Sequence, residues 1–202
     1  MLRTIFSFLF IVLIASNAFS VIRPENIVGI WLLDEGKGDI AADISGNNHE
    51  GKVMGAKWVD GKFGKALLFE GAGEVKIQST EKLNLGEQLT MMAYFNTHAL
   101  VDWHQIIAKN NEYLLRIDPP GEGTRMSAFV NLNGAWEPRA SAFVPEKDRW
   151  YHFAATYSSK TKQLIVFVDG KQAGQSVREG KPTPNNEPVT FGHWGGGSRF
   201  RG

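Results

Sequence analysis

The chain has 202 residues, with 22 Lys and Arg against 21 Asp and Glu, and it contains no cysteine. The missing cysteines exclude disulfides and an N-terminal lipidated cysteine, so stability must come from burial or from metal ligation. The balanced charge excludes the basic footprint of nucleic-acid-binding proteins, and the length suits one domain with a sizeable core.

The first twenty residues, Met1 to Ser20, have the pattern of a secretory signal peptide. Arg3 precedes an apolar run from Ile5 to Ile14, and small residues around Ala18 stand where a signal peptidase would cleave. The run has about ten residues, whereas a transmembrane helix needs roughly twenty. We therefore expect a mature chain that is secreted or held in the cell envelope, periplasmic or extracellular, with no transmembrane segment. The alternative is an uncleaved helix that is amphipathic or anchors the chain in a membrane.

Residues 21–202 are predicted to form one all-β domain. Apolar residues come in short runs bounded by Gly, Pro, Asp-Gly and Asn-Gly, and none recurs at helical spacing over more than two turns. About ten short strands in one domain favour two packed sheets. The predicted strands are Val28 to Leu33, Ala66 to Phe69, Glu74 to Ile77, Leu89 to Phe95, Gln105 to Lys109, Glu112 to Ile117, Arg125 to Leu132, Trp150 to Tyr157, Leu164 to Val168 and Val189 to Phe191.

Two dipeptides predict tight hairpins, because both tolerate the positive φ angles that such turns demand. Asn133-Gly134 follows the strand that ends at Leu132, and Asp169-Gly170 follows the run Leu164 to Val168. That run is apolar at every position, which indicates a sheet covered on both sides or a strand that lines an apolar concavity.

Six short motifs, in their linear order, carry a family resemblance. They are Gly29 to Gly38, Ala42 to Gly51, Gly61 to Gly71, Leu89-Thr90 through Tyr94, Trp150 to Ala154, and Val168 to Gly170. From about Ile27 onward the chain resembles the LamG-like jelly-roll domains of the concanavalin A-like lectin/glucanase superfamily. The resemblance implies a two-sheet antiparallel jelly roll with one concave sheet, used mostly as a binding module in secreted and cell-surface proteins.

The sequence departs from the family pattern in two places. Tyr94 stands where relatives usually have Trp. The family pattern also continues past a segment like Arg199 to Gly202 into a final strand, so we expect a C-terminally truncated jelly roll that lacks this strand. Because the last strand of such sandwiches lies beside the first, its absence would leave Val28 to Leu33 with an unpaired edge.

No catalytic residues are predicted. A glucanase of this superfamily would need two carboxylates alternating on one strand, at the separation that suits a glycosidic bond. Glu70 and Glu74 flank a glycine-containing turn instead, and Asp34 and Glu35 lie in a glycine-rich loop. The five histidines show no metal-type spacing. We therefore expect a protein that is not an enzyme.

The segment from Asp43 to Asn48 is the candidate metal site. Calcium prefers carboxylate and amide oxygens gathered by a flexible loop, and the sequence offers Asp43, Asn47 and Asn48 around Gly46. The resemblance adds that many relatives hold a structural calcium. The alternative is an ordinary Asx turn in which Asp43 accepts backbone N–H groups.

Aromatic residues in loops and at strand ends are the candidate ligand contacts, because sugar rings stack on indoles while nearby polar groups bind the hydroxyls. For each tryptophan, burial at the end of the sandwich is the alternative. The candidates are Trp103, His104, Trp136, Arg139 and Trp194, with Arg116 as a further donor; Trp31, Trp58 and Trp150 are assigned to the core.

The sequence thus predicts a secreted, non-catalytic module that binds an extracellular glycan or another extracellular ligand. One alternative is an adhesive protein–protein module that presents a sheet edge or a loop face to a partner chain. A glycoside hydrolase is kept as a further alternative because the superfamily contains such enzymes.

Overall fold

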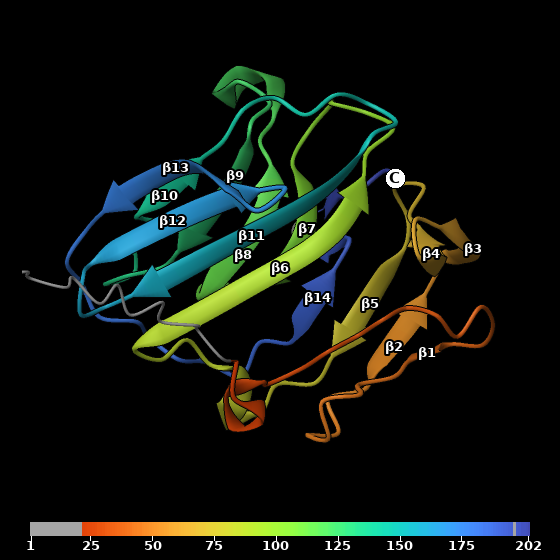
Figure 1. Ribbon diagram of the computed structural model, residues 1–202, viewed down its shortest axis with the longest axis horizontal. Coiled ribbons are helices and arrows are strands. Elements are labelled where there is room, and N and C mark those ends of the chain that lie inside the picture. Colours follow the sequence, from red (N-terminus) through yellow and green to blue (C-terminus); the bar gives the residue numbers. More distant parts are fainter. Residues whose placement is uncertain (1–21, 196) are drawn as a thin grey trace, which may run out of the picture.

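A computed structural model describes residues 22–195 and 197–202, so the predicted signal peptide lies outside the described residues. Strands dominate these residues and pack as two layers, which confirms the predicted all-β jelly roll (Figure 1). Short 3₁₀ turns at Pro24–Asn26, Glu81–Leu83 and Pro120–Glu122 are its helical elements. None of the helices in the described part is long and apolar enough to cross a bilayer.

One layer is an antiparallel sheet whose spatial order is β1-β2-β5-β14-β7-β8-β9-β10. Its inner strands lie behind the other layer in Figure 1. The bounds are β1 (Ile40–Ala41), β2 (Gly51–Met54), β5 (Glu74–Ile77), β14 (Val189–Phe191), β7 (His104–Lys109), β8 (Tyr113–Ile117), β9 (Met126–Val130) and β10 (Arg139–Ser141).

The other layer is an antiparallel sheet in the order β13-β12-β11-β6, and two separate hairpins complete the fold. The bounds are β13 (Lys171–Val177), β12 (Gln163–Val168), β11 (Trp150–Ser158), β6 (Gln88–Asn96), β3 (Lys57–Gly61), β4 (Gly64–Leu68), β15 (His193–Trp194) and β16 (Ser198–Arg199).

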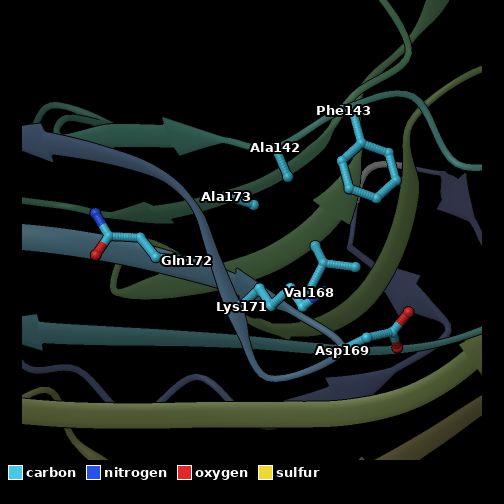
Figure 2. Close-up of a pocket in the computed structure, with 7 residues that line it drawn as sticks. All are labelled: Ala142, Phe143, Val168, Asp169, Lys171, Gln172 and Ala173. Atoms are coloured by element: carbon cyan, nitrogen blue, oxygen red, sulfur yellow. The ribbon is translucent and has the colours of Figure 1, made fainter.

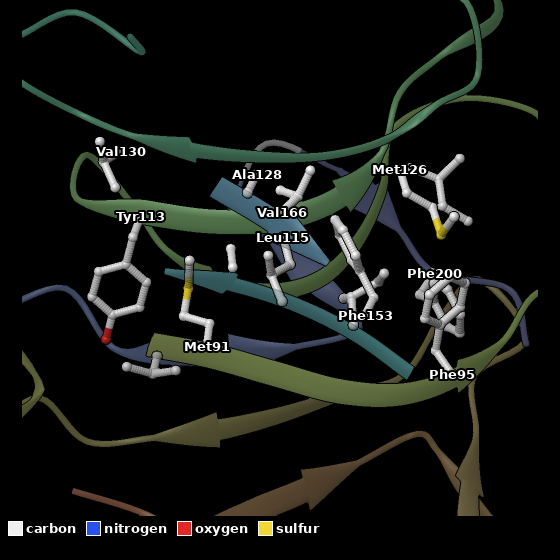
Figure 3. Packing of buried hydrophobic residues seen from close by; sticks show 14 of the residues in the cluster. Met91, Phe95, Tyr113, Leu115, Met126, Ala128, Val130, Phe153, Val166 and Phe200 are labelled. Atoms are coloured by element: carbon white, nitrogen blue, oxygen red, sulfur yellow. The ribbon is translucent and has the colours of Figure 1, made fainter. Parts of the chain in front are cut away.

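The core lies between the two sheets, where apolar side chains from both inner faces meet (Figure 3). Leu115 and Met126 from the larger sheet and Phe153 and Val166 from the smaller one are fully buried. Each strand alternates between core and outer face, as the period of two requires. This alternation leaves the opposite face of the eight-stranded sheet free to build a site.

The β12 run shows this alternation despite its uniformly apolar sequence. Leu164, Val166 and Val168 are buried, whereas Ile165 and Phe167 are partly exposed on the outer face. The sheet is therefore packed on one side and not covered on both. Both predicted tight turns are confirmed by positive φ angles at their two central residues, 54° and 78° at Asn133-Gly134 and 48° and 77° at Asp169-Gly170.

The predicted strand Val28 to Leu33 is wrong. This segment forms no strand, and its polar groups bind loop atoms in place of a strand ladder. The Ile30 N–H donates to the Asp43 carboxylate at 2.9 Å, and the Ile30 carbonyl accepts from the Ile44 N–H at 2.9 Å. A side chain thus replaces a neighbouring strand as the partner.

Two of the three tryptophans assigned to the core pack there. Trp31 and Trp58 are partly buried against the core cluster. The assignment of Trp150 to the core is corrected. Trp150 is the first residue of β11, lies on the outer face of the smaller sheet and is not part of the core cluster. Its register partner is Asn96, whereas the inward-facing neighbour Tyr151 pairs with Phe95.

Candidate functional site

A concavity of about 520 Å³ lies on the outer face of the eight-stranded sheet. We call it the tryptophan pocket, because three indoles from separate connections surround it. Strand residues of β7, β8 and β9 form its base, and loop residues form its rim. It is lined by Asp102, Trp103, Gln105, Leu114, Arg116, Glu122, Phe129, Trp136, Trp194, Gly197 and Ser198.

The three tryptophans predicted from sequence come together here. Trp103 lies in the loop before β7 and is 41% exposed. Trp136 follows the Asn133-Gly134 turn, and Trp194 belongs to β15; both are partly buried against the small apolar cluster of Ala108, Leu114 and Phe129. The indoles are thus supported from one side and accessible from the other, an arrangement between full burial and free exposure.

Hydrogen bonds fix two of these indoles. The Trp103 Nε1–H donates to Glu122 Oε1 at 3.3 Å, and the Trp194 Nε1–H donates to Asn110 Oδ1 at 2.9 Å. Rotation of either ring would break its bond, so both rings are held in position before any ligand arrives. Such preorganisation reduces the side-chain entropy that is lost when a ligand binds.

Gln105 forms part of the base of the tryptophan pocket, and it is not among the ligand contacts predicted from the sequence. It faces Arg116 across the β7–β8 pair, is only 2% exposed, and its Oε1 has no hydrogen-bond partner among the described residues. A buried acceptor without a partner costs roughly 1–3 kcal/mol. Such an atom in the wall of a concavity points to a ligand that supplies the missing donor.

A network of ion pairs joins the pocket to the neighbouring outer face. Arg116 donates from Nε to Asp118 at 2.8 Å and from Nη2 to Glu122 at 2.6 Å. Arg139 donates to the same two carboxylates, with a distance of 2.9 Å between its Nη1 and Glu122 Oε2. Both guanidinium groups also lie over the Phe129 ring, at 4.4 and 5.3 Å from its centroid. The predicted donors Arg116 and Arg139 therefore support the pocket while bound to carboxylates.

The prediction that His104 contacts the ligand is corrected by its position in the structure. It lies next to Trp103 in the sequence but is 1% exposed, and its ring packs at 5.9 Å from Phe200, on the core side of β7. Burial, and secondarily the charge of Arg201, holds the pKa of His104 below its ordinary value. Alternation along the strand turns Gln105 toward the pocket and His104 away from it.

The predicted metal loop uses its carboxylate internally. Asp43 has a fully buried side chain that accepts the N–H groups of Ile30, Ser45 and His49 at 2.9 to 3.0 Å and the Ser45 hydroxyl at 2.8 Å. Burial alone would raise the pKa of Asp43, but these hydrogen bonds outweigh it and hold the pKa below its ordinary value. This is the geometry of the Asx-turn alternative.

The two asparagines of this loop do not complete a calcium shell. Asn47 donates through Nδ2 to the carbonyls of Ile27 and Val28, and its Oδ1 accepts from Lys82 Nζ at 2.6 Å. A lysine ammonium at that oxygen would repel a cation, and Asn48 serves as a turn residue with φ 59°. The donor set does not fit Ca²⁺. Nor does the described part of the chain hold a cluster of three His, Asp or Glu side chains suited to a metal.

The carboxylates considered for glycoside hydrolysis each contact a different structural partner. Glu70 pairs with Lys57 at 2.5 Å, and Glu74 pairs with His193 at 2.7 Å. Asp34 accepts the N–H of Lys65 at 2.8 Å. Each of these acids has a local structural contact, and none of them lines the tryptophan pocket.

A second concavity, of about 560 Å³, lies where β10, β12 and β13 meet. Figure 2 shows Phe143 and Val168 on one side of it and Gln172 on the other, with Asp169 at the hairpin. Asp169 Oδ1 already accepts the His152 N–H at 3.0 Å. None of the described buried polar atoms without a partner lies here, which distinguishes this concavity from the tryptophan pocket.

Comparison with known proteins identifies the superfamily to which the chain belongs. A model of the concanavalin A-like lectin/glucanases superfamily matches residues 69–202, and the chain belongs to this superfamily. The match covers more than half of the chain and includes every strand that lines the tryptophan pocket. No curated protein matches the sequence.

Solved structures share the fold at low sequence identity. Domain 4 of an extracellular GH43 arabinanase from Geobacillus stearothermophilus, in complex with arabinotriose, matches with a TM-score of 0.62 and 17% identity over 79% of this chain and 81% of that chain. The binding domain of botulinum neurotoxin DC, in complex with SialylT, matches with a TM-score of 0.62 and 15% identity over 82% of this chain. A putative carbohydrate-binding protein from Bacteroides ovatus has a TM-score of 0.54 and 22% identity over 67% of this chain. The matched regions are 44% and 40% of the last two chains, less than half of each.

Proposed function

We propose that the protein is a non-catalytic carbohydrate-binding module of the extracellular space or cell envelope, and that the tryptophan pocket is its glycan site. The observation that carries the proposal is the buried, unpartnered Oε1 of Gln105 beneath partly exposed indoles. A saccharide suits both the indoles and the unpartnered oxygen, because its C–H faces stack on indoles and its hydroxyls donate to an amide oxygen.

The comparisons support this proposal from a different direction. The solved structures named above include a domain bound to arabinotriose, a domain bound to SialylT and a putative carbohydrate-binding protein. At such low identities the shared property is the fold, which serves many functions. The chemistry of the pocket, and not the fold alone, therefore has to carry the assignment to a glycan.

The absence of catalysis is proposed from the ion pairs of the pocket. Glycoside hydrolysis needs one carboxyl group that can give up a proton and a second one that is free to attack or to activate water. Asp118 and Glu122 are each bound by both Arg116 and Arg139, which occupies their oxygens. Neither carboxylate is free to attack a sugar or to activate water.

One observation favours a second candidate, adhesion to another protein. The outer face of the smaller sheet exposes Met92 and Tyr94, and Phe63 from the tip of the β3–β4 hairpin packs edge-on against Tyr94 at 5.0 Å. Exposed apolar side chains that gather in this way are typical of protein-binding surfaces. This face is remote from the tryptophan pocket, so the two candidates can be tested separately.

The test is glycan binding by residues 21–202, first on a glycan array and then by calorimetry with the strongest ligand. Trp103→Ala and Trp136→Ala should each weaken binding by about 2 kcal/mol, or ~30-fold, as expected for aromatic contacts at the centre of a site. Phe63→Ala is the matched control, since Phe63 is also an exposed aromatic residue but lies at the tip of the β3–β4 hairpin, against the outer face of the smaller sheet. An array without a bound glycan, or binding lost in Phe63→Ala and kept in both tryptophan variants, would overturn the assignment.

A further inference from the structure

The charges around the tryptophan pocket cancel before any ligand binds. Arg116 and Arg139 each contact both Asp118 and Glu122, so two guanidinium groups face two carboxylates. These four side chains are mostly buried, with Asp118 completely enclosed. An anionic ligand that approached either arginine would have to compete with carboxylates that are already in place.

Asp102 adds a negative charge at the rim. It lines the pocket, is exposed, and is held by a hydrogen bond from the Trp103 N–H to its Oδ1 at 2.9 Å. No Lys or Arg of the described residues forms an ion pair with it. With the network neutral, the site has a formal charge of about −1, which repels a carboxylate or a sulfate.

The hydrogen-bonding groups of the pocket favour a ligand that both donates and accepts. The buried Oε1 of Gln105 and the exposed carboxylate of Asp102 are acceptors. The indole N–H groups of Trp103 and Trp194 already donate to Glu122 and Asn110, whereas the Trp136 N–H, also at the pocket, forms no hydrogen bond with the described residues. Carboxylate and sulfate groups only accept hydrogen bonds, whereas hydroxyl groups also donate them.

We infer that the tryptophan pocket selects uncharged saccharides rich in free hydroxyls and discriminates against glycans that carry a carboxylate or sulfate on the bound unit. This inference rests on the proposed function and specifies its ligand class. Repulsion by one negative charge at the rim of a partly solvated site should weaken the binding of an acidic glycan by roughly 10-fold relative to its neutral counterpart.

The experiment uses pairs of glycans that share one backbone and differ only in a charged group. Neutral oligosaccharides are compared with the same chains oxidised to the uronic acid, capped with sialic acid, or sulfated, at low ionic strength and at 0.15 M salt. We expect the neutral member of each pair to bind about 10-fold more tightly at low salt. The difference in affinity should be smaller at the higher salt because the charges are screened.

Asp102→Asn tests the origin of the preference. Asparagine keeps the size of the side chain and tolerates the φ of 81° found at this position. Relative to the wild type, the variant should shift the ratio of acidic-glycan to neutral-glycan affinity about 5-fold in favour of the acidic glycan. Asp169→Asn is the matched control, since Asp169 also has a positive φ and accepts a backbone N–H through Oδ1, but lies outside the tryptophan pocket.

The outcomes separate the two proposals. Equal or tighter binding of the acidic members would overturn the selection for uncharged saccharides and leave the glycan site standing. A preference that is unchanged in Asp102→Asn would overturn the role of the rim charge. An array on which no glycan of either kind binds would overturn the proposed function, and this inference with it.

Discussion

The Asp43 turn and the tryptophan pocket both contain polar side chains but use their polar atoms differently. In the turn, the Asp43 carboxylate accepts four hydrogen bonds from its own chain. In the pocket, Gln105 Oε1 is buried with no partner among the described residues. Polar composition alone therefore does not identify a binding site, and we propose the pocket as the site because its unpartnered acceptor lies beside apolar surface.

The largest expected effect is on the turn. Asp43→Ala removes an acceptor that serves three backbone N–H groups and one hydroxyl, which would be left without partners in a partly buried loop. We expect a loss of about 3 kcal/mol in the free energy of unfolding, measured by urea denaturation, with glycan affinity unchanged in the folded protein. Asp39→Ala is the control, because Asp39 is exposed. A loss below about 1 kcal/mol would contradict the structural role of the turn.

Gln105→Met should instead raise the free energy of unfolding and weaken glycan binding. Methionine has a similar shape and no amide, so the unpartnered buried acceptor disappears and the free energy of unfolding should rise by about 1 kcal/mol. Glycan affinity should fall about 10-fold because a ligand hydroxyl loses its acceptor. Gln88→Met, at an exposed position of β6, should change neither quantity. Wild-type affinity in Gln105→Met would exclude Gln105 from the site.

The effect of pH should distinguish the two regions further. Because the pKa of Asp43 is lowered in the folded state, its stabilising effect is complete above the ordinary value of 3.8 and is lost as the pH falls through the lowered pKa. The stability difference between wild type and Asp43→Asn should therefore narrow from pH 5 to pH 3, as measured by urea denaturation. A difference that stays constant over this range would mean that Asp43 is not held in its charged form by the turn.

The smallest expected effect is that of calcium. The Asp43 carboxylate is committed to its own turn and Lys82 binds the Asn47 oxygen, so excess Ca²⁺ and EDTA should give the same melting temperature for residues 21–202. A ligand that binds only the folded state must raise the melting temperature. A calcium-dependent rise that is absent in Asp43→Asn would restore the predicted metal site.

The sequence was sufficient to predict features that depend on local chemistry. Asn-Gly and Asp-Gly turns and short apolar runs identified the main hairpins and the sandwich. They did not reveal the polar edge strand Lys171–Val177, whose Lys-Gln-Ala-Gly-Gln-Ser-Val sequence has no clear apolar alternation. They also suggested a strand at Val28 to Leu33, where loop groups and the Asp43 carboxylate take the place of a neighbouring strand.

The candidate site was predictable in its aromatic part only. Loop tryptophans can be recognised from their flanking residues, and Trp103, Trp136 and Trp194 do line one pocket. The partners of Arg139 depend on contacts between β8, the Pro120–Glu122 turn and β10, which linear spacing does not disclose. Whether His104 or Gln105 faces outward depends on the phase of β7 relative to the core. Gln105 had no sequence signal beyond its place in a predicted strand.

The three indoles of the pocket lie on segments far apart in the chain, the loop before β7, the segment after the Asn133-Gly134 turn and β15, while the strands beneath them also hold the core. A substitution, insertion or shortening in one connection alters one wall and leaves the other two, together with the sandwich, in place. Recognition can therefore diversify by small local changes, each starting from a partly working site. A library that randomises only the residues flanking Trp136 would change one wall of the pocket and leave the packing of Trp136 on Ala108, Leu114 and Phe129 in place.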